Sequence, residues 1–161
     1  MPKTMEELTL VLEKIKAIHP EITGVVSRNQ INSLTAFGVM YKTAMGMIYD
    51  NVSDRWIYAP MYDGYKEMVT DLNTLHGKDL LDKEFFTAST EQWEEKLVNK
   101  TGVFTIDWPA RAKMEEDAYK LLHPEDSVFD LQLMLPLTTK NSPEMRINTS
   151  QVVGSSSAYA V

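Results

Sequence analysis

The 161-residue chain contains no cysteine, which excludes disulfides, thiolate metal sites and a cysteine nucleophile. Basic residues are in the minority, because 16 Lys and Arg stand against 23 Asp and Glu, for a formal net charge of −7. This balance argues against nucleic acid or an anionic membrane as the main partner. No apolar run is long enough to cross a membrane, so we expect no direct membrane insertion of this segment.

The composition that remains is that of an ordinary globular protein. Hydrophobic residues make up 43% of the chain and charged residues 24%, and 161 residues suffice for one domain with a real core. No signal-peptide pattern opens the sequence, and a helix start follows Met1 almost directly. We therefore expect residues 1–161 to be a single domain excised from a longer protein.

Helical and strand patterns alternate along the chain, which indicates an α/β or α+β class. Apolar residues three and four apart, or capping signals, predict helices. These helices begin near Met5, Ile31, Met61, Thr90 and Pro109. The predicted strands are residues 22–26, 55–60, 103–106, 129–135, 145–153 and 158–161. Residues 42–53 are methionine-rich and show no period.

Residues 89–111 carry the clearest local signals. Ser89 and Gln92 have the spacing of a capping box, so a helix should begin between them. Gly102 follows a polar run and marks the exit from that helix. Residues 103–106 then form a short β-favouring run. The stretch therefore predicts a helix, a tight turn and a buried strand, followed by a second helix.

A candidate ligand-binding corner lies at the junction of that strand and the second helix. Pro109 suits a first helical position, because its missing N–H would have no partner there. Asp107 and Trp108 precede it directly, and Arg111 follows within one turn. In open α/β sheets, ligands bind outside the carboxyl ends of strands. The alternative for Trp108 is burial between strand and helix for packing alone.

A second candidate corner follows the first predicted strand. Arg28, Asn29 and Gln30 occupy the position there that Asp107 and Trp108 occupy after the later strand. Their alternative interpretation is a solvated turn with a helix cap, which we favour at this stage.

The other large side chains are predicted to be core. We assign Trp93 and Trp56 to the interior. The helix that begins at Pro109 is expected to turn four apolar residues inward, namely Met114, Ala118, Leu121 and Leu122.

The three histidines do not indicate a metal site. His19, His76 and His123 each lie at a predicted helix end, where a cation meets the negative end of the helix dipole. No two of them have the spacing of metal ligands. No nucleophile elbow, P-loop or dinucleotide fingerprint is present either, so we expect no cofactor and no metal.

Several motifs occur in the order found in one known family. The opening PKTMEEL at residues 2–8 resembles a P-x-T-W-x-E-L helix start, and GKDLLDKEF at 77–85 resembles a G-L-I-D-P-E-F loop. Residues 90–104 are similar to a helix followed by G-K-V-G-M, and LMLPL at 133–137 is similar to an L-P-P strand end. Residues 155–161 look like the strand that returns to the other lobe. Together these motifs resemble the bacterial extracellular solute-binding proteins of ABC importers, family 1, of the lipoprotein type.

The resemblance implies a fold and a function. The family fold has two α/β lobes around a ligand cleft, and this chain would be the second lobe of that type II periplasmic-binding-protein-like fold, a small mixed sheet flanked by helices. The implied function is capture of a solute, an oligosaccharide, by closure of the two lobes without catalysis. The implied partners are ABC permease subunits. The implied location is the extracellular face of the cell membrane or the periplasm, with a lipid anchor in an N-terminal region outside this chain.

The corner residues would then contact a sugar. An indole face can stack on a sugar ring while short polar groups bind hydroxyls, the plan of many ligand sites. Two departures from the family pattern matter. Met5 replaces the usual tryptophan, and residues 19–24 carry one carboxylate where relatives have an acidic, glycine-rich loop that can bind calcium. The resemblance therefore implies no metal site here.

Two other functions remain open from the sequence. The chain could be a domain of a carbohydrate-active enzyme that uses the Asp107 and Glu84 carboxylates. It could also be an interaction domain with no small ligand. A first lobe or a catalytic domain upstream would discriminate between the receptor and the enzyme.

Overall fold

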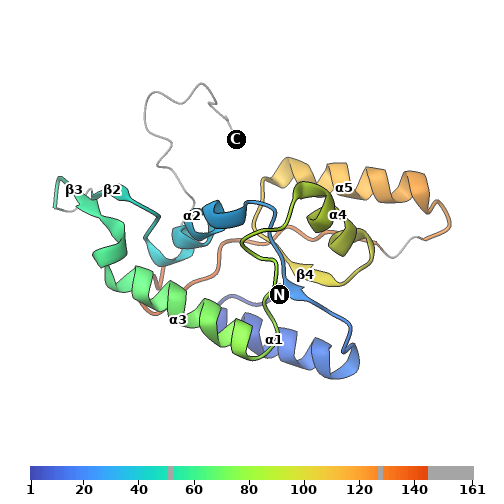
Figure 1. Ribbon diagram of the computed structural model, residues 1–161, viewed down its shortest axis with the longest axis horizontal. Coiled ribbons are helices and arrows are strands. Elements are labelled where there is room, and N and C mark those ends of the chain that lie inside the picture. The colour runs from blue at the N-terminus through green and yellow to red at the C-terminus, as the bar shows by residue number, and fades with distance from the viewer. Residues whose placement is uncertain (51–52, 127–128, 145–161) are drawn as a thin grey trace.

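Five α-helices and four short strands make up the part of the chain that the computed structural model describes, residues 1–50, 53–126 and 129–144 (Figure 1). The α-helices are α1 (Met5–Ile18), α2 (Ser33–Gly38), α3 (Asp63–Gly77), α4 (Thr90–Val98) and α5 (Pro109–Leu122). The strands are β1 (Gly24–Val25), β2 (Met47–Asp50), β3 (Arg55–Tyr58) and β4 (Gly102–Phe104). Three short 3-10 helices are η1 (Gln30–Asn32), η2 (Val39–Tyr41) and η3 (Ala59–Met61).

The helix starts follow the capping signals of the sequence. At α4 the capping box is complete, because the Ser89 side chain accepts from the Gln92 N–H and the Gln92 side chain accepts from the Ser89 N–H. At α1 the Thr4 hydroxyl accepts from the Glu7 N–H, but the Glu7 carboxylate accepts from the Lys3 N–H instead of completing the box. All three histidines lie at helix ends, as predicted.

The parallel pair β1–β4 positions the segments that carry the two predicted corners. Gly24 pairs with Gly102 and Val25 with Phe104, with an irregularity in register between them. Both strands are shorter than predicted. Gly24 has a φ of +84°, and a Cβ there would lie 2.3 Å from the Leu80 carbonyl oxygen, so the glycine permits the close approach of the loop after α3.

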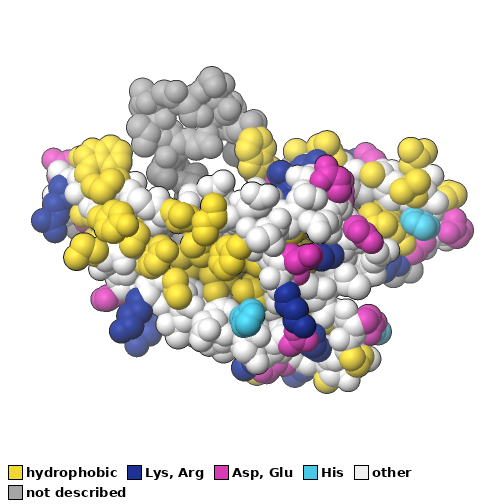
Figure 2. Space-filling view, viewed as in Figure 1, with side chains coloured by type: hydrophobic (Ala, Val, Ile, Leu, Met, Phe, Trp, Pro, Cys, Tyr) yellow, Lys and Arg dark blue, Asp and Glu magenta, His cyan; other side chains and the backbone are white. Residues whose placement is uncertain are grey.

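The strands β2 and β3 form a separate antiparallel hairpin. The hairpin lies at one end of the long axis, and α5 extends toward the other end (Figure 1). β2 falls in the methionine-rich stretch that shows no period. The prediction that Trp56 is core was wrong, because its side chain is 58% exposed on a face of the hairpin that it shares with Tyr49. Figure 2 shows apolar side chains gathered over this end.

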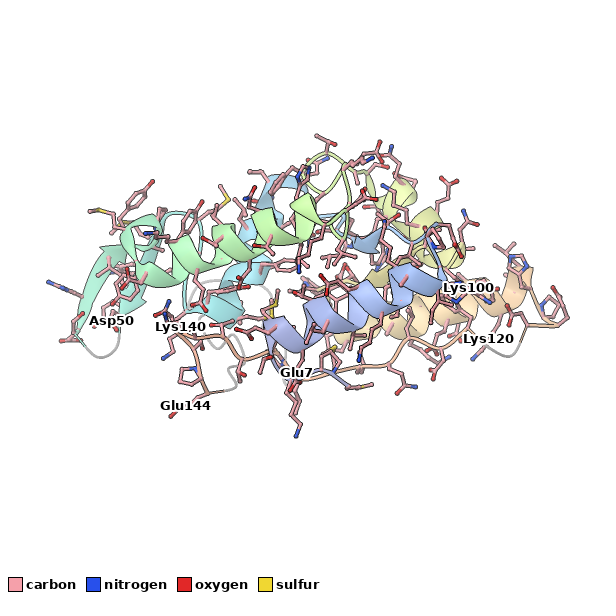
Figure 3. All side chains as sticks on the ribbon, turned by 90° about the horizontal axis from the view of Figure 1, so that it is seen from below. Glu7, Asp50, Lys100, Lys120, Lys140 and Glu144 are labelled. Atoms are coloured by element: carbon pink, nitrogen blue, oxygen red, sulfur yellow. The ribbon has the colours of Figure 1, made fainter. Side chains whose placement is uncertain are left out.

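The main core joins α1, α2 and α3 to the loop after α3. Leu12, Phe37 and Met68 are almost fully buried in it, one from each helix. α1 and α3 run side by side along one face of the molecule (Figures 1 and 3). A second small cluster joins Val26 to Trp93 and Leu97 of α4, and Trp93 is 1% exposed, which confirms its prediction as core.

The face of α5 that turns inward differs from the prediction. Met114, Ala118, Leu121 and Leu122 are exposed. Glu115 and Tyr119 are buried instead, and Tyr119 stacks on Phe129 at 4.1 Å between ring centroids. The prediction from the apolar stripe was wrong because α5 packs against the rest of the protein through the ion-paired Glu115 and the aromatic ring of Tyr119.

The predicted strand at 129–135 was also wrong. The described residues there form no strand, and Leu133 and Leu135 are exposed. Alternating apolar residues are not sufficient for a strand, which also requires a neighbour whose backbone can pair with it. Pairing begins only at Thr138, which forms a parallel bridge with Thr4. The predicted strands at 145–153 and 158–161 lie outside the described residues.

The predicted fold class is confirmed, since short strands in small sheets are flanked by helices. The strands form two separate two-stranded sheets, one parallel and one antiparallel, within the described residues. Among the helices that the structure describes, none combines the length and apolar character that a bilayer span requires.

Candidate functional site

The two predicted corners meet in the structure. β1 and β4 are parallel neighbours, so the segments that leave their carboxyl ends emerge at the same edge. Arg28 follows β1 and Asp107 follows β4, and the two side chains form a bidentate ion pair. Arg28 Nε lies 2.5 Å from Asp107 Oδ2, and Arg28 Nη2 lies 2.9 Å from Asp107 Oδ1. The sequence placed these residues at equivalent positions, but it did not predict their contact.

The Arg28–Asp107 pair is held on several sides. The Asp107 side chain is only 6% exposed, and its Oδ1 also accepts a hydrogen bond from the Trp108 N–H at 2.7 Å. The hydrogen bond to Asp107 is the largest influence on Arg28 and raises the pKa of its guanidinium above the ordinary value. The Arg28 guanidinium is therefore held in its charged form, and the bidentate geometry defines the orientation of both groups.

Trp93 lies beneath this pair. The guanidinium carbon of Arg28 is 5.6 Å from the centroid of the indole, and that of Arg111 is 5.3 Å from it. The indole Nε1 donates to Thr105 Oγ1 at 3.1 Å. Two guanidinium groups thus lie over the buried indole of Trp93, and the single N–H of that indole is hydrogen-bonded. Trp93 therefore supports both arginines of the corner.

Arg111 links α4 to α5. Its Nη2 lies 2.6 Å from Glu94 Oε1 and 2.9 Å from Glu115 Oε1, and its side chain is 20% exposed. Its Nε is buried and has no hydrogen-bond partner among the described residues. Burial raises the pKa of Glu115 above 4.5, while the charge of Arg111 opposes that shift. Arg111 thus supports the corner from within the α4–α5 interface.

Trp108 is the large exposed side chain of the corner. It is 56% exposed and caps the start of α5, and its carbonyl oxygen accepts from the Arg111 N–H at 2.9 Å. The interpretation of Trp108 as a buried packing residue was therefore wrong.

The turn after β1 brings two further predicted residues to the same side. The Asn29 N–H donates to Ser27 Oγ at 3.2 Å, and Ser27 Oγ also shares a 2.6 Å hydrogen bond with Ser33 Oγ. Gln30 is exposed and has a φ of +51°. The solvated turn of the alternative interpretation is present, since the chain bends at residues 28–29 and Gln30 is exposed, but its helix cap is not, because the Asn29 side chain makes no capping hydrogen bond to η1. The tight turn presents Asn29 and Gln30 next to Arg28.

Glu84 belongs to a different cluster. Lys96 Nζ lies 2.7 Å from both Asp82 and Glu84, at the wall of an open pocket of about 450 Å³. Asp107 does not line that pocket and is paired with Arg28. Each of the two carboxylates that the enzyme hypothesis needs is thus bound to its own cation, in a different part of the molecule. Within the described ranges, no three His, Asp or Glu side chains are placed to hold a metal ion.

Part of this network was within reach of sequence reasoning. Arg111 and Glu115 are four apart on one helix, a spacing that allows an ion pair. Trp93 could be recognised as core, but not as the partner of two guanidinium groups, because Arg28 is 65 positions away. Contacts at such separations depend on the pairing of β1 with β4.

Two solved structures have a fold similar to that of this chain. The alginate-binding protein AlgQ2, in its structure without calcium ion, matches with a TM-score of 0.71 at 21% sequence identity, over 88% of this chain and 30% of AlgQ2. The S. pneumoniae ABC-transporter substrate-binding protein FusA, an EF-hand mutant in complex with fructo-nystose, matches with a TM-score of 0.57 at 21% identity, over 88% of this chain and 29% of FusA.

These matches confirm that the chain has the fold of part of a periplasmic binding protein, as the sequence resemblance implied. The chain spans less than one third of the length of either structure. No protein-family model and no curated protein matches the chain.

Proposed function

We propose that this chain is one lobe of the solute receptor of an ABC importer, and that it binds an oligosaccharide by closure of two lobes without catalysis. The observation that carries the proposal is the exposed indole of Trp108 beside the Arg28–Asp107 pair, at the carboxyl ends of β1 and β4. The matched structures support it, because one is named as an alginate-binding protein and the other holds fructo-nystose.

Each corner residue has a role in this proposal. Trp108 offers a flat apolar face for a sugar ring, while the exposed parts of Arg28, Asn29 and Gln30 offer polar groups to its hydroxyls. Asp107 orients Arg28 and accepts hydrogen bonds. Arg111 supports the corner through its ion pairs, and direct contact between Arg111 and the ligand stays a prediction.

The wider setting is part of the same proposal. The second lobe would close over the corner and bury the sugar, which strengthens every polar contact made there. The permease subunits would recognise the closed receptor. Its location would be the extracellular face of the membrane or the periplasm, with a lipid anchor outside these residues.

The test compares the ligand affinities of two alanine variants of the intact two-lobed protein, each of which lacks a tryptophan of similar exposure. Trp108 is 56% exposed at the corner, and Trp56 is 58% exposed on the hairpin. Covering about 80 Å² of indole at about 25 cal/mol per Å² stabilises the complex by about 2 kcal/mol. Trp108→Ala should therefore weaken binding roughly 30-fold, whereas Trp56→Ala should leave the affinity unchanged.

Calorimetry with a panel of oligosaccharides gives the affinities, and thermal unfolding gives the stability of each variant. Both variants should unfold close to the parent, because both indoles face solvent. Unchanged affinity in Trp108→Ala, or an equal loss in Trp56→Ala, would count against the corner as the ligand site.

A further inference from the structure

We infer that this lobe selects an uncharged sugar over an anionic one such as a uronate, because the cations at the corner are already paired with carboxylates of the protein. The inference rests on the proposed function and names the chemical class of its ligand. Three features at such a corner could attract an anion, namely Arg28, Arg111 and the start of α5.

The charge of Arg28 is already compensated by a carboxylate of the protein. Bidentate recognition of a carboxylate uses two parallel N–H groups of the guanidinium fork. In this protein the Nε–Nη2 edge already binds both oxygens of Asp107, at 2.5 and 2.9 Å. The Asp107 side chain is 6% exposed and is held by the Trp108 N–H as well, so a ligand would meet only the remaining N–H groups of a guanidinium whose charge is already compensated within the protein.

Arg111 is committed in the same way. Its Nη2 bridges Glu94 and Glu115 at 2.6 and 2.9 Å, and the Glu115 side chain is 7% exposed. Lys113, which follows Arg111 by two residues and is exposed on α5, pairs with Asp117. The cations near the beginning of this helix are therefore neutralised within the protein.

The start of α5 lies beside the same carboxylate. A helix N-terminus attracts anions through its free N–H groups. Here the N–H of Trp108 donates to Asp107, and Pro109 at the first helical position has no N–H to offer. Asp107 thus places a carboxylate of the protein beside the start of α5, which disfavours a second anion there.

The charges of the corner support the same direction of selection. Two guanidinium groups, of Arg28 and Arg111, are set among three carboxylates, of Asp107, Glu94 and Glu115. The formal excess is one negative charge. If Glu115 is protonated the corner is neutral, and in neither state is it positive. Hydroxyl groups can still bind to the remaining N–H groups of Arg28, so the corner accepts a neutral sugar.

The experiment uses matched pairs of oligosaccharides on the intact protein. Each pair has a neutral member and its uronate, such as mannotetraose and tetramannuronate, with glucose and galactose pairs of the same design. Calorimetry should show at least one neutral member binding ten-fold or more tighter than its uronate. A uronate that binds as tightly as its neutral partner would overturn the inference and leave the proposed function standing. Binding of no member would remove the proposed function, and the inference with it.

Asp107→Asn tests the cause. This change keeps the shape of the side chain but leaves the positive charge of Arg28 without a compensating carboxylate. The ratio of the affinity for the neutral sugar to the affinity for its uronate should therefore fall at least ten-fold. Asp117→Asn, on the exposed side of α5, raises the net charge equally and should leave the ratio unchanged. An unchanged ratio in a folded Asp107→Asn protein would refute the argument. If that variant fails to fold, Glu94→Gln must shift the ratio in the same direction, because its more exposed carboxylate pairs with Arg111.

Discussion

Replacement of Trp93 by alanine provides a direct test of how the corner is supported. Trp93 is 1% exposed and contacts the hydrophobic cluster of Val26 and Leu97 on one side and two guanidinium groups on the other. Truncation of a buried tryptophan costs about 3–5 kcal/mol. The lost hydrogen bond from Nε1 to Thr105 adds about 1 kcal/mol. We expect Trp93→Ala to lose about 4–6 kcal/mol in the free energy of unfolding, close to the whole stability of many domains.

Urea denaturation followed by circular dichroism measures this loss without relying on tryptophan fluorescence. For a chain of this length, about 2–4 °C of melting temperature corresponds to each kcal/mol, so the expected drop is roughly 8–24 °C. Trp93→Phe keeps an aromatic face beneath Arg28 and Arg111 but removes the donor to Thr105, and should lose much less. Trp56→Ala removes an exposed indole and serves as the control. A loss below about 1 kcal/mol in Trp93→Ala, or one equal to that of Trp56→Ala, would refute the reasoning.

Two further predictions concern stability alone. Gly64→Ala should destabilise the protein by about 1–3 kcal/mol, because a Cβ at Gly64 would lie 2.0 Å from the Tyr41 carbonyl oxygen. Gly77→Ala, at the other end of α3 with no atom within 4 Å, should instead stabilise it by about 0.4–1 kcal/mol, and chemical denaturation distinguishes the two. Burial raises the pKa of Glu115 above 4.5, so the folded state holds its proton more tightly than the unfolded chain does. The parent should therefore lose stability relative to Glu115→Gln as pH rises from 4.5 through the folded pKa, and parallel curves over that range would contradict this.

Short-range signals in the sequence were sufficient for the helices near the site. The capping box at Ser89 and the proline at Pro109 describe interactions within one helical turn, and both helices begin where these signals predict. The strand between them was shorter than expected, but its position was correct. The corner of Asp107 and Trp108 could be located for the same reason, because its position depends only on where one strand ends and one helix begins.

Patterns of apolar residues were less reliable wherever burial depends on a distant neighbour. The apolar stripe of α5 that includes Met114 and Leu121 faces solvent, while Glu115 is buried because Arg111 compensates its charge. Trp56 is exposed because β2 and β3 form a ribbon of two strands apart from the β1–β4 pair. Hydrophobicity predicts that burial of a side chain would stabilise the fold. Whether the side chain is buried depends on whether another element packs against it.

The chemistry of the corner was decided by tertiary structure. Arg28 and Asp107 are 79 residues apart, and no local pattern distinguishes an arginine that is free to bind a ligand from one already paired with a carboxylate. The parallel pairing of β1 with β4 brings the two strand ends together, and Trp93 positions both Arg28 and Arg111 over one ring. The sequence determined which residues stand at the strand ends, because that depends on local backbone preferences. The fold determined their partners, because electrostatic interactions depend on distance in space.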